Sequence, residues 1–244
     1  MEKAKRQTRR PNYGIDAPGV IRNMLVIGVA LLIASGVARN FRSSWQYTFL
    51  WTGIALLAES LLMLSYSRWG KLLHRERMLK LHAWRGDEQV LDVGTGRGLL
   101  LVGAAKRLTT GRATGIDIWN AADLSGNARE RTEENLALEE VAPICVLMSE
   151  DVVKMSFPDA SFDVVVSNLC LHNIEDGAKR RRAVGEIARV LKPGGKAILS
   201  DFKKTGEYAR VLRESGLETR RRWPNLLTTF PPLTIVTSRK AEQP

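Results

Sequence analysis

The chain has 244 residues and a formal net charge of +11 at pH 7, from 37 Lys and Arg against 26 Asp and Glu. This length provides for one substantial domain and an appendage, and the charge favours anionic partners, which include nucleic acid and anionic lipid. Two cysteines and three scattered histidines exclude a disulfide framework and predict no metal site.

Two apolar segments occupy residues 20–66, ahead of the rest of the chain. The first covers residues 24–38 and, with Val20 and Ile21, approaches the roughly 20 residues that cross a bilayer. The second covers residues 45–66 and has aromatic residues at its ends, as helices do at membrane interfaces. We interpret residues 20–66 as a two-helix membrane hairpin. A signal peptide and a pair of buried core helices are the alternatives, and the second apolar segment argues against the signal peptide.

Basic residues flank this hairpin on both sides. Residues 1–19 form a basic tail, expected to be disordered over residues 1–14, and further cations follow the second segment. Only Arg39 and Arg42 lie in the short connection, so the positive-inside rule places both termini and the following domain in the cytoplasm. Glu59 is the one acid inside the second segment. It is either a functional intramembrane group or a tolerated carboxyl, and we favour the second interpretation.

The remaining chain alternates between helical and strand patterns. Residues 67–84 predict a connecting helix, which Gly86 and Asp87 end, and residues 85–244 predict a domain. Hydrophobic runs predict strands at residues 89–93, 112–118, 144–148, 162–167, 196–200, 217–222 and 233–237. Helical periodicity predicts helices at residues 99–108, 123–138, 179–191 and 207–215. This alternation is typical of an α/β fold with a doubly wound parallel sheet.

The stretch VLDVGTGRG (residues 90–98) joins the first strand to the helix that follows it. In an open α/β sheet, ligands bind beyond the carboxyl ends of the strands, and glycines let the backbone approach a ligand closely. A single glycine-rich turn is also common without any ligand. Asp117 and Asp151 follow the next two strands, where carboxylates can accept hydrogen bonds from ribose hydroxyls and from an exocyclic amine. With SNLCLHN (residues 167–173) after the fourth strand, these residues predict a ligand-binding edge.

Four motifs together resemble the class I S-adenosylmethionine-dependent methyltransferases, with spacing similar to the small-molecule and quinone methyltransferases. They are VLDVGTGRG, GIDIW, the acid within SEDVVKMSFPDASFDVVVSN, and RVLKPGGKAIL, and the resemblance covers about residues 85–240. It implies a Rossmann-like, mostly parallel sheet of seven strands, the last of them antiparallel. It also implies S-adenosylmethionine as the cofactor.

The resemblance further implies a role for particular residues. Asp92 and the glycine loop (Gly94, Thr95, Gly96 and Gly98) would hold the methionine part of the cofactor, and Asp117 would bind its ribose. The other implied contacts are Ile118 and Trp119 beside the adenine, Asp151 and Val152 at its edge, and Asn168 and Leu169 near the sulfonium and methyl group.

Methyl transfer from a sulfonium is an in-line displacement, which depends on positioning donor and acceptor more than on acid–base chemistry. His172 is the candidate base if the acceptor must lose a proton, and a structural role in its loop is the alternative. Cys170 is expected to be a packed thiol. The residues from Asn168 to Leu171 read Asn-Leu-Cys-Leu instead of an Asn-Pro-Pro-Tyr-like motif, which argues against methylation of amide or base nitrogens.

Arginines gather in two places in the domain. Residues 180–182 form one cluster, and residues 220–222, with Arg210 and Arg213 upstream, form another. They indicate nucleic acid, an anionic membrane leaflet or an ordinary solvated surface. A membrane hairpin favours the leaflet over nucleic acid, and the sequence contains no aromatic-rich stacking platform.

These observations predict a membrane-anchored, cytoplasm-facing methyltransferase preceded by two transmembrane helices. Its partners would be the lipid bilayer and a hydrophobic small-molecule or lipid-like acceptor, which the hairpin motivates. A membrane-tethered nucleotide-binding oxidoreductase and a non-catalytic module with the same fold are the alternatives. The acceptor atom and the oligomeric state do not follow from the sequence.

Overall fold

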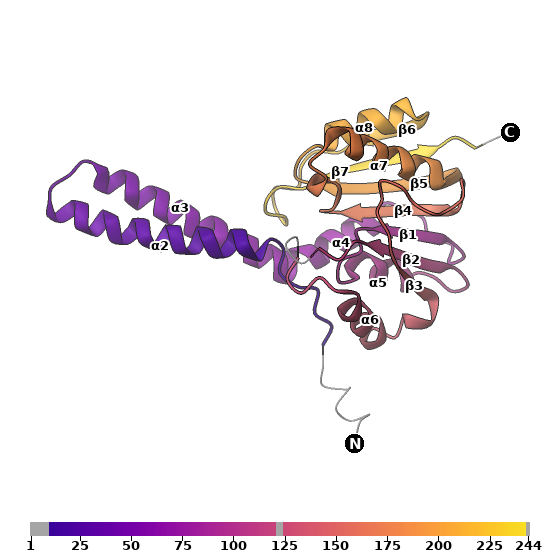
Figure 1. Cartoon of the computed structure of the whole chain (residues 1–244), viewed down its shortest axis with the longest axis horizontal. Helices are drawn as coiled ribbons and strands as arrows, with labels where there is room; N and C mark the ends of the chain where they lie inside the picture. The colour runs from indigo at the N-terminus through magenta and orange to yellow at the C-terminus, as the bar shows by residue number, and fades with distance from the viewer. Residues whose placement is uncertain (1–9, 121–123, 243–244) are drawn as a thin grey trace, which may run out of the picture.

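A computed structural model describes residues 10–120 and 124–242. It contains a seven-stranded sheet with helices on both faces, and a long helical hairpin projects from one edge of this domain (Figure 1). The strands are β1 (Gln89–Val93), β2 (Arg112–Asp117), β3 (Cys145–Ser149), β4 (Phe162–Asn168), β5 (Leu191–Asp201), β6 (Leu217–Arg221) and β7 (Thr234–Lys240).

The strand order is β3-β2-β1-β4-β5-β7-β6, so the sheet is mixed and not wholly parallel. Pairing is parallel from β3 through β5, and β7 is antiparallel to both β5 and β6. β7 is antiparallel to β6 because a loop without a crossover helix joins the two strands, so the chain returns in the opposite direction. The antiparallel last strand implied by the resemblance is confirmed, whereas the wholly parallel sheet predicted from alternation alone is wrong at β7.

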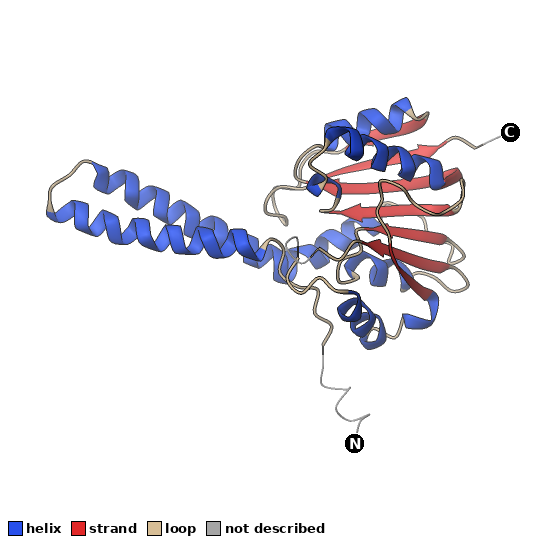
Figure 2. Ribbon diagram, in the orientation of Figure 1, coloured by secondary structure: helices blue, strands red, loops and turns tan. Residues whose placement is uncertain are grey.

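Helices cover both faces of the sheet (Figure 2), which confirms the doubly wound arrangement. On one face, α4 (Lys71–Leu79), α5 (Leu99–Ala105) and α6 (Arg129–Leu138) contribute to a core with Val90, Ala113 and Val164. On the other face, α7 (Gly177–Val190) and α8 (Thr205–Glu214) pack on a second core with Leu91, Val165 and Leu199. Neighbouring strand residues therefore alternate between two apolar layers, as a sheet buried on both faces requires.

The largest differences from the predicted element boundaries concern three elements. The helix expected at residues 123–138 begins only at Arg129, because Leu124 forms a β-bridge with Asp16 and Ser125 donates its backbone N–H to Ile15 O. Residues 121–123 lie outside the described residues. The connecting helix is shorter than expected and ends at Leu79, and β5 begins at Leu191, ahead of the Pro-Gly-Gly turn.

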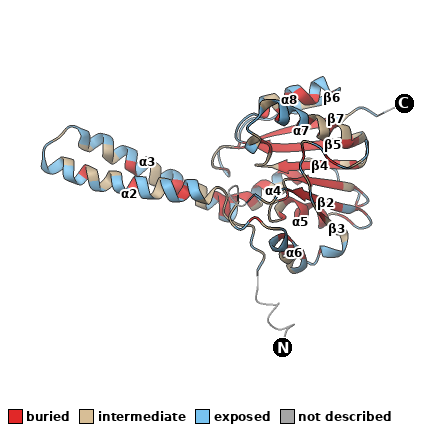
Figure 3. Ribbon diagram, in the orientation of Figure 1, coloured by how far each residue is buried: buried red, intermediate tan, exposed pale blue. Residues whose placement is uncertain are grey.

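The hairpin consists of α2 (Pro18–Asn40) and α3 (Trp45–Ser65). At 1.5 Å per residue their 23 and 21 residues give lengths of about 35 and 32 Å, comparable with the hydrocarbon core of a bilayer. Both are apolar enough to cross a membrane by length and composition. They pack on each other and leave most of their surface exposed (Figure 3), which differs from the helices of a buried core.

Small residues bring the two hairpin helices together. A Cβ on Gly53 would lie 3.0 Å from Gly28 O, and one on Gly28 would lie 3.2 Å from Gly53 O, so the backbones meet closely at this crossing. Nearer the connection, Ser35 Oγ donates to Gln46 O at 2.8 Å. Glu59 lies on the exposed face of α3.

A π-helix, η1 (Tyr66–Gly70), joins α3 to α4. Its residues Tyr66, Ser67 and Gly70 are buried, so the chain passes from the exposed hairpin to the domain core within one turn. Such π-turns are frequent at functional sites.

The segment ahead of the hairpin, residues 10–17, forms a strap across α6 and the loop before it. Asn12 and Asn135 exchange two hydrogen bonds of 2.9 and 3.0 Å, and the Tyr13 hydroxyl donates to Glu139 Oε1 at 2.6 Å. The disorder expected for residues 1–14 is therefore wrong for residues 10–14, because their backbone and side chains have long-range partners. Residues 1–9 lie outside the described residues.

Lys71 joins the strap to the base of the hairpin. Its side chain is 4% exposed, and Nζ donates to Tyr13 O (2.8 Å), Gly14 O (2.6 Å) and Asp16 Oδ2 (3.2 Å). Ser67 closes this cluster, because its Oγ donates to Asp16 Oδ2 at 3.0 Å and accepts from Asp16 N at 3.1 Å. Burial lowers the pKa of Lys71, and the Asp16 carboxylate opposes that shift.

We predict that Lys71→Met lowers the free energy of unfolding by about 3 kcal/mol, because it removes three hydrogen bonds of a buried ammonium and leaves two strap carbonyls without their donor. Chemical denaturation of the domain in detergent measures this. Lys80→Met is the matched control, since Lys80 follows the same helix and is exposed. Equal stability of the two variants would contradict the role assigned to Lys71.

Candidate active site

The predicted site residues lie at the carboxyl ends of β1, β2 and β4 and in the loops after β1, β2, β3 and β4. These four strands are neighbours and run parallel, so their carboxyl ends meet at one edge of the sheet. Figure 1 shows that the hairpin leaves the domain on this side. The structure therefore brings the predicted residues to a single edge, as the motifs indicated.

The glycine loop is fixed against both neighbouring strand ends. Gly94 N and Thr95 N donate to Ile116 O of β2 at 2.9 and 3.0 Å. A Cβ on Gly94 would lie 2.2 Å from Cys170 Sγ in the loop after β4, and its φ of +69° is unfavourable for other residues. Gly94 is thus required by packing between two loops of the protein, whereas the sequence suggested only close approach to a ligand.

Asp117 holds the glycine loop from the end of β2. Its Oδ2 accepts from Gly96 N at 2.7 Å, and its Oδ1 accepts from Trp119 N at 2.6 Å and from Asn127 Nδ2 at 3.3 Å. The carboxylate is 9% exposed. A carboxylate has about four lone-pair sites, so three of them organise the loops and one is left for a ligand hydroxyl.

Asp92 is the penultimate residue of β1, just before the glycine loop, and is 1% exposed. Its Oδ2 accepts from Thr95 Oγ1 at 2.9 Å. Burial raises the pKa of Asp92 to about 7, and the charge of Asp117 adds to the rise, whereas the hydrogen bonds from Thr95 and the Leu101 backbone oppose it. A buried carboxyl that titrates near neutrality suits a site that receives a cation.

The residues implied to hold an adenine lie after β2 and β3. Trp119 has a positive φ of 59° and donates Nε1 to Ser149 Oγ at 2.8 Å, so its indole bridges the two strand ends. Ile118 is exposed beside it. Asp151 caps its own turn by accepting from Val153 N at 2.9 Å, and the Val152 side chain packs in the core.

Asn168 is the last residue of β4 and Leu169 follows it, at the centre of the edge. Leu169 has a positive φ of 53°, an uncommon conformation for a branched residue, and donates its N–H to Ser200 O at 3.0 Å. Asn168 Oδ1 is buried and lacks a hydrogen bond of standard geometry. This orphaned oxygen and that of Asn127, beside Asp117, are available to a polar ligand, which supports the fit of a cofactor here.

Tyr66 is a site residue that sequence reasoning missed. It belongs to η1 and is 4% exposed, and its hydroxyl lies beside the Asn168 side chain without a hydrogen bond of standard geometry. Asp16 and Asp201 contribute negative charge around it. Its position at the end of an apolar run favoured a membrane-interface role, and no local signal in the sequence connects it to β4.

His172 lies in the short helix η3 (Leu171–Asn173) after β4. Its Nδ1 is 2.8 Å from Asp201 Oδ1, although the contact is poorly aligned for a hydrogen bond, and its backbone N–H donates to Asp201 Oδ2 at 3.2 Å. Tyr208 also donates to Asp201 Oδ2, at 3.1 Å. A buried carboxylate therefore orients His172, which is the arrangement of a general base and its positioning residue.

A second histidine reaches the same region from α4. His74 Nε2 is 2.7 Å from Ser200 Oγ, and its Nδ1 is buried without a hydrogen-bond partner. Burial lowers the pKa of His74 to about 4, so the ring is neutral at physiological pH.

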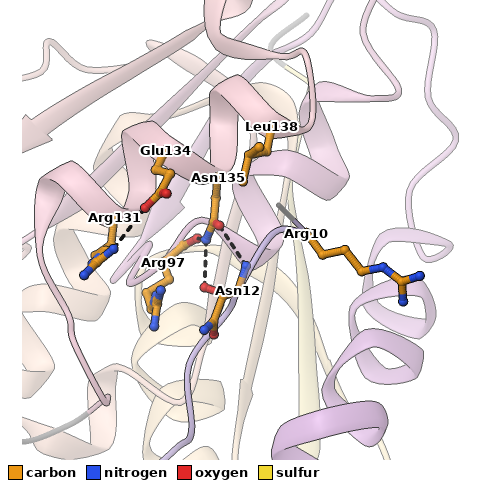
Figure 4. A pocket seen from close by; sticks show the side chains of 7 residues that line it. All are labelled: Arg10, Asn12, Arg97, Arg131, Glu134, Asn135 and Leu138. Carbon is orange, nitrogen blue, oxygen red and sulfur yellow. Dashed lines mark hydrogen bonds and ion pairs between the residues drawn. The ribbon is translucent and has the colours of Figure 1, made fainter. Parts of the chain in front are cut away.

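A cavity of about 210 Å³ lies between the strap and α6, beside Arg97 of the loop after β1 (Figure 4). It is lined by Arg10, Asn12, Arg97, Arg131, Glu134, Asn135 and Leu138, and only Arg97 comes from the glycine loop. Several of its polar groups are engaged with one another, since Asn12 pairs with Asn135 and Arg131 with Glu134, whereas Arg97 Nε is buried without a hydrogen-bond partner. We do not assign the cofactor to this cavity.

The first arginine cluster is not one surface. Arg180 is 6% exposed and pairs with Glu207 at 2.9 Å, and its guanidinium also donates to Ile174 O, so it is a structural ion pair. Arg181 lies 3.9 Å from Glu214 and remains exposed. Within the described residues, no group of three or more His, Cys, Asp or Glu side chains forms a metal site.

Residues 91–199 match the sequence family described as "Methyltransferase domain". The chain is 32% identical over 132 residues to a ubiquinone/menaquinone biosynthesis C-methyltransferase of Bdellovibrio bacteriovorus, covering 53% of this chain and 51% of that protein. It is also 32% identical over 152 residues to a demethylmenaquinone methyltransferase of Symbiobacterium thermophilum, covering 62% and 55%. The chain thus spans about half the length of the curated relatives that it matches.

Solved structures share the fold at lower identity. A SAM-dependent methyltransferase from Aquifex aeolicus has a TM-score of 0.54 at 20% identity, covering 69% of this chain and 90% of that one. The cyclase SpnF has a TM-score of 0.59 at 17% identity, covering 70% and 81%, so the fold alone does not specify the reaction. The sequence match therefore covers residues 91–199, and the seven-stranded sheet has the Rossmann-like methyltransferase fold of these solved structures.

Proposed function

We propose that this protein is a bilayer-anchored, S-adenosylmethionine-dependent methyltransferase whose acceptor is a hydrophobic, quinone-type small molecule. The proposal rests chiefly on the hydrogen bond from Gly96 N to Asp117 Oδ2, at 2.7 Å. It holds the carboxylate that we propose binds the ribose against the glycine loop. Relatives named as quinone methyltransferases support the acceptor class.

The cofactor, when bound, supplies an electrophilic methyl group on a sulfonium. Asp92, Gly94, Thr95, Gly96 and Gly98 would hold its methionine part. The other cofactor contacts are Asp117 at the ribose, Ile118, Trp119, Asp151 and Val152 around the adenine, and Asn168 and Leu169 near the methyl group. These loops are locked to one another by hydrogen bonds, so the site is preorganised and the residues contribute by orientation.

Proton transfer from the acceptor falls to His172. Asp201 faces its Nδ1, which leaves Nε2 to receive a proton, and the Phe202 ring packs on the imidazole at 4.7 Å between centroids. A positioned base of this kind contributes typically about 100- to 10,000-fold to a rate. The buried Tyr66 hydroxyl beside Asn168 would orient an acceptor oxygen, and it brings the hairpin's end into the site.

The anchoring proposal rests on the exposed apolar surface of the hairpin. Only 17% and 11% of the apolar windows in its two helices are buried, which is unlike a core helix of a water-soluble domain. The second helix continues through η1 into the domain, which a cleaved signal sequence would not do. With positive charge on the domain side, the proposal places both termini and the catalytic domain in the cytoplasm.

The central experiment incubates the full chain in nanodiscs with methyl-labelled S-adenosylmethionine and a demethylated quinone extract. We expect label in the quinone fraction and a loss of at least about tenfold in Asp117→Asn, because the carboxylate's charged hydrogen bonds are each worth about 1.5–3 kcal/mol. Asp87→Asn, exposed at the opposite edge, is the matched control. Tight binding of NADH without binding of S-adenosylhomocysteine would refute the proposal in favour of an oxidoreductase.

Cofactor affinity should depend on the ionisation of Asp92. With a pKa of about 7, the carboxyl is about one-tenth ionised at pH 6 and about nine-tenths at pH 8, so a cationic ammonium group should bind up to about tenfold more tightly at pH 8. Calorimetric titration with S-adenosylhomocysteine at both pH values measures this. Asp92→Asn should bind more weakly and lose the pH dependence, and a persistent dependence in that variant would assign it to another group.

The hairpin should be removable if the strap is kept. We predict that replacing residues 18–65 with a short Gly-Ser linker yields a water-soluble domain that still binds S-adenosylhomocysteine, because Asp16 and Ser67 are hydrogen-bonded neighbours. A domain that lacks residues 1–66 should be less stable than the linker variant, because the deletion removes all three hydrogen-bond acceptors of Lys71. Retention of the linker variant in membranes after a carbonate wash would contradict the anchoring role of the hairpin.

A further inference from the structure

The loop between β6 and β7 carries a compact apolar tip that the proposed reaction does not use. Its side chains Trp223, Leu226 and Leu227 are 91%, 75% and 95% exposed. Contiguous exposed apolar patches that are rimmed by polar residues mark protein or membrane interaction sites. We define residues 223–227 as the apolar tip.

A buried asparagine holds the tip in shape. Asn225 is 5% exposed, and its Oδ1 accepts from Leu227 N at 3.1 Å and Thr228 N at 3.3 Å, which forms a turn. Its backbone N–H donates to Leu233 O at 2.8 Å, and its carbonyl accepts from Thr229 Oγ1 at 2.6 Å. The two leucines are therefore presented outward by a defined turn and are not exposed through a lack of local structure.

The tip is placed beside the base of the hairpin. A Cβ on Gly70 of η1 would lie 2.5 Å from Thr228 O, so the loop packs against the chain where α3 enters the domain. Trp69, next to that contact, is 64% exposed. Because β6 runs parallel to β5, the loop after it leaves the same edge as the site loops, and Figure 1 shows it on the side of the domain where the hairpin leaves.

Basic residues precede the apolar tip directly. Arg220, Arg221 and Arg222 are exposed, and residues 223–227 contain no acid. Arginine beside tryptophan and leucine matches the chemistry of an anionic headgroup layer above acyl chains. A second copy of this chain would also cover apolar surface, but its +11 charge would oppose the arginines.

We propose that residues 220–227 form a membrane-insertion loop, in which Trp223, Leu226 and Leu227 enter the acyl region of the anionic leaflet that holds the hairpin. This inference rests on the proposed bilayer anchoring. The hairpin and the loop are then two attachments on one edge of the sheet, and together they fix the site loops to face the leaflet. The hairpin alone would still allow the whole molecule to turn in the bilayer, and the loop restrains that movement.

The test uses the full chain in nanodiscs containing phosphatidylglycerol, in a Cys145→Ala and Cys170→Ala background that still binds S-adenosylhomocysteine. Leu227→Cys carries an environment-sensitive nitrobenzoxadiazole label. Asp87→Cys, 61% exposed ahead of β1 at the opposite edge, is the matched control. We expect nitroxide-labelled lipid to quench the label at position 227 and aqueous iodide to quench the label at position 87.

Two results would overturn the insertion loop. Equal iodide quenching at both positions shows that the tip stays in water, and protection from iodide without nitroxide quenching shows that a second copy covers it. Arg222→Gln should weaken the preference for phosphatidylglycerol over phosphatidylcholine, whereas Leu226→Asp with Leu227→Cys should abolish lipid quenching. Carbonate-resistant membrane retention and S-adenosylhomocysteine binding are measured on the same samples, so failure of the loop is distinguishable from failure of the anchoring or of the enzyme.

Discussion

The buried ammonium of Lys71 is the interaction on which the arrangement of the other parts depends. It donates to two carbonyls of the strap and to Asp16, so the segment before the hairpin and the helix after it are held at one point. The strap in turn covers α6 and pairs with the loop next to Asp117. Lys71, at the base of the hairpin, is therefore connected through the strap to the loop after β2, which borders the proposed cofactor site.

The edge formed by the carboxyl ends of the strands collects every feature that the proposed reaction needs. The glycine loop, Asp117, Asn168 and His172 come from successive strand ends, and η1 adds Tyr66 from the hairpin side. An acceptor dissolved in a bilayer would meet this edge first. The cofactor is water-soluble, so the same edge must also remain open to the cytoplasm, and the hairpin occupies only one side of it.

Local sequence signals were sufficient to predict the strands and the strand-end motifs. The β-branched run FDVVVS and the glycine-rich turn in VLDVGTGRG each favour one local conformation without help from distant residues. Such signals were insufficient where partners are distant. Residues 10–14 follow a short basic run and resembled the end of a disordered tail, yet Asn12 and Tyr13 pair with residues in α6 and at its C-terminus. From the sequence, Tyr66 resembled an aromatic residue at a membrane interface and Arg180 resembled a surface cation. In the fold, Tyr66 lies beside Asn168, and Arg180 forms an ion pair with Glu207.

The π-helix η1 determines how α4 is rotated about the helix axis relative to α3. The exposed helix α3 packs against α2, whereas α4 packs on the sheet. Each residue of an α-helix advances the side-chain direction by about 100°, so removing one residue between Tyr66 and Gly70 would turn α4 by that angle relative to α3. Lys71 and His74 would then point away from the strap and β5 while the hairpin kept its own packing. The wider turn of η1 thus allows the exposed apolar helix α3 and the partly buried helix α4 to follow each other along one continuous helical segment.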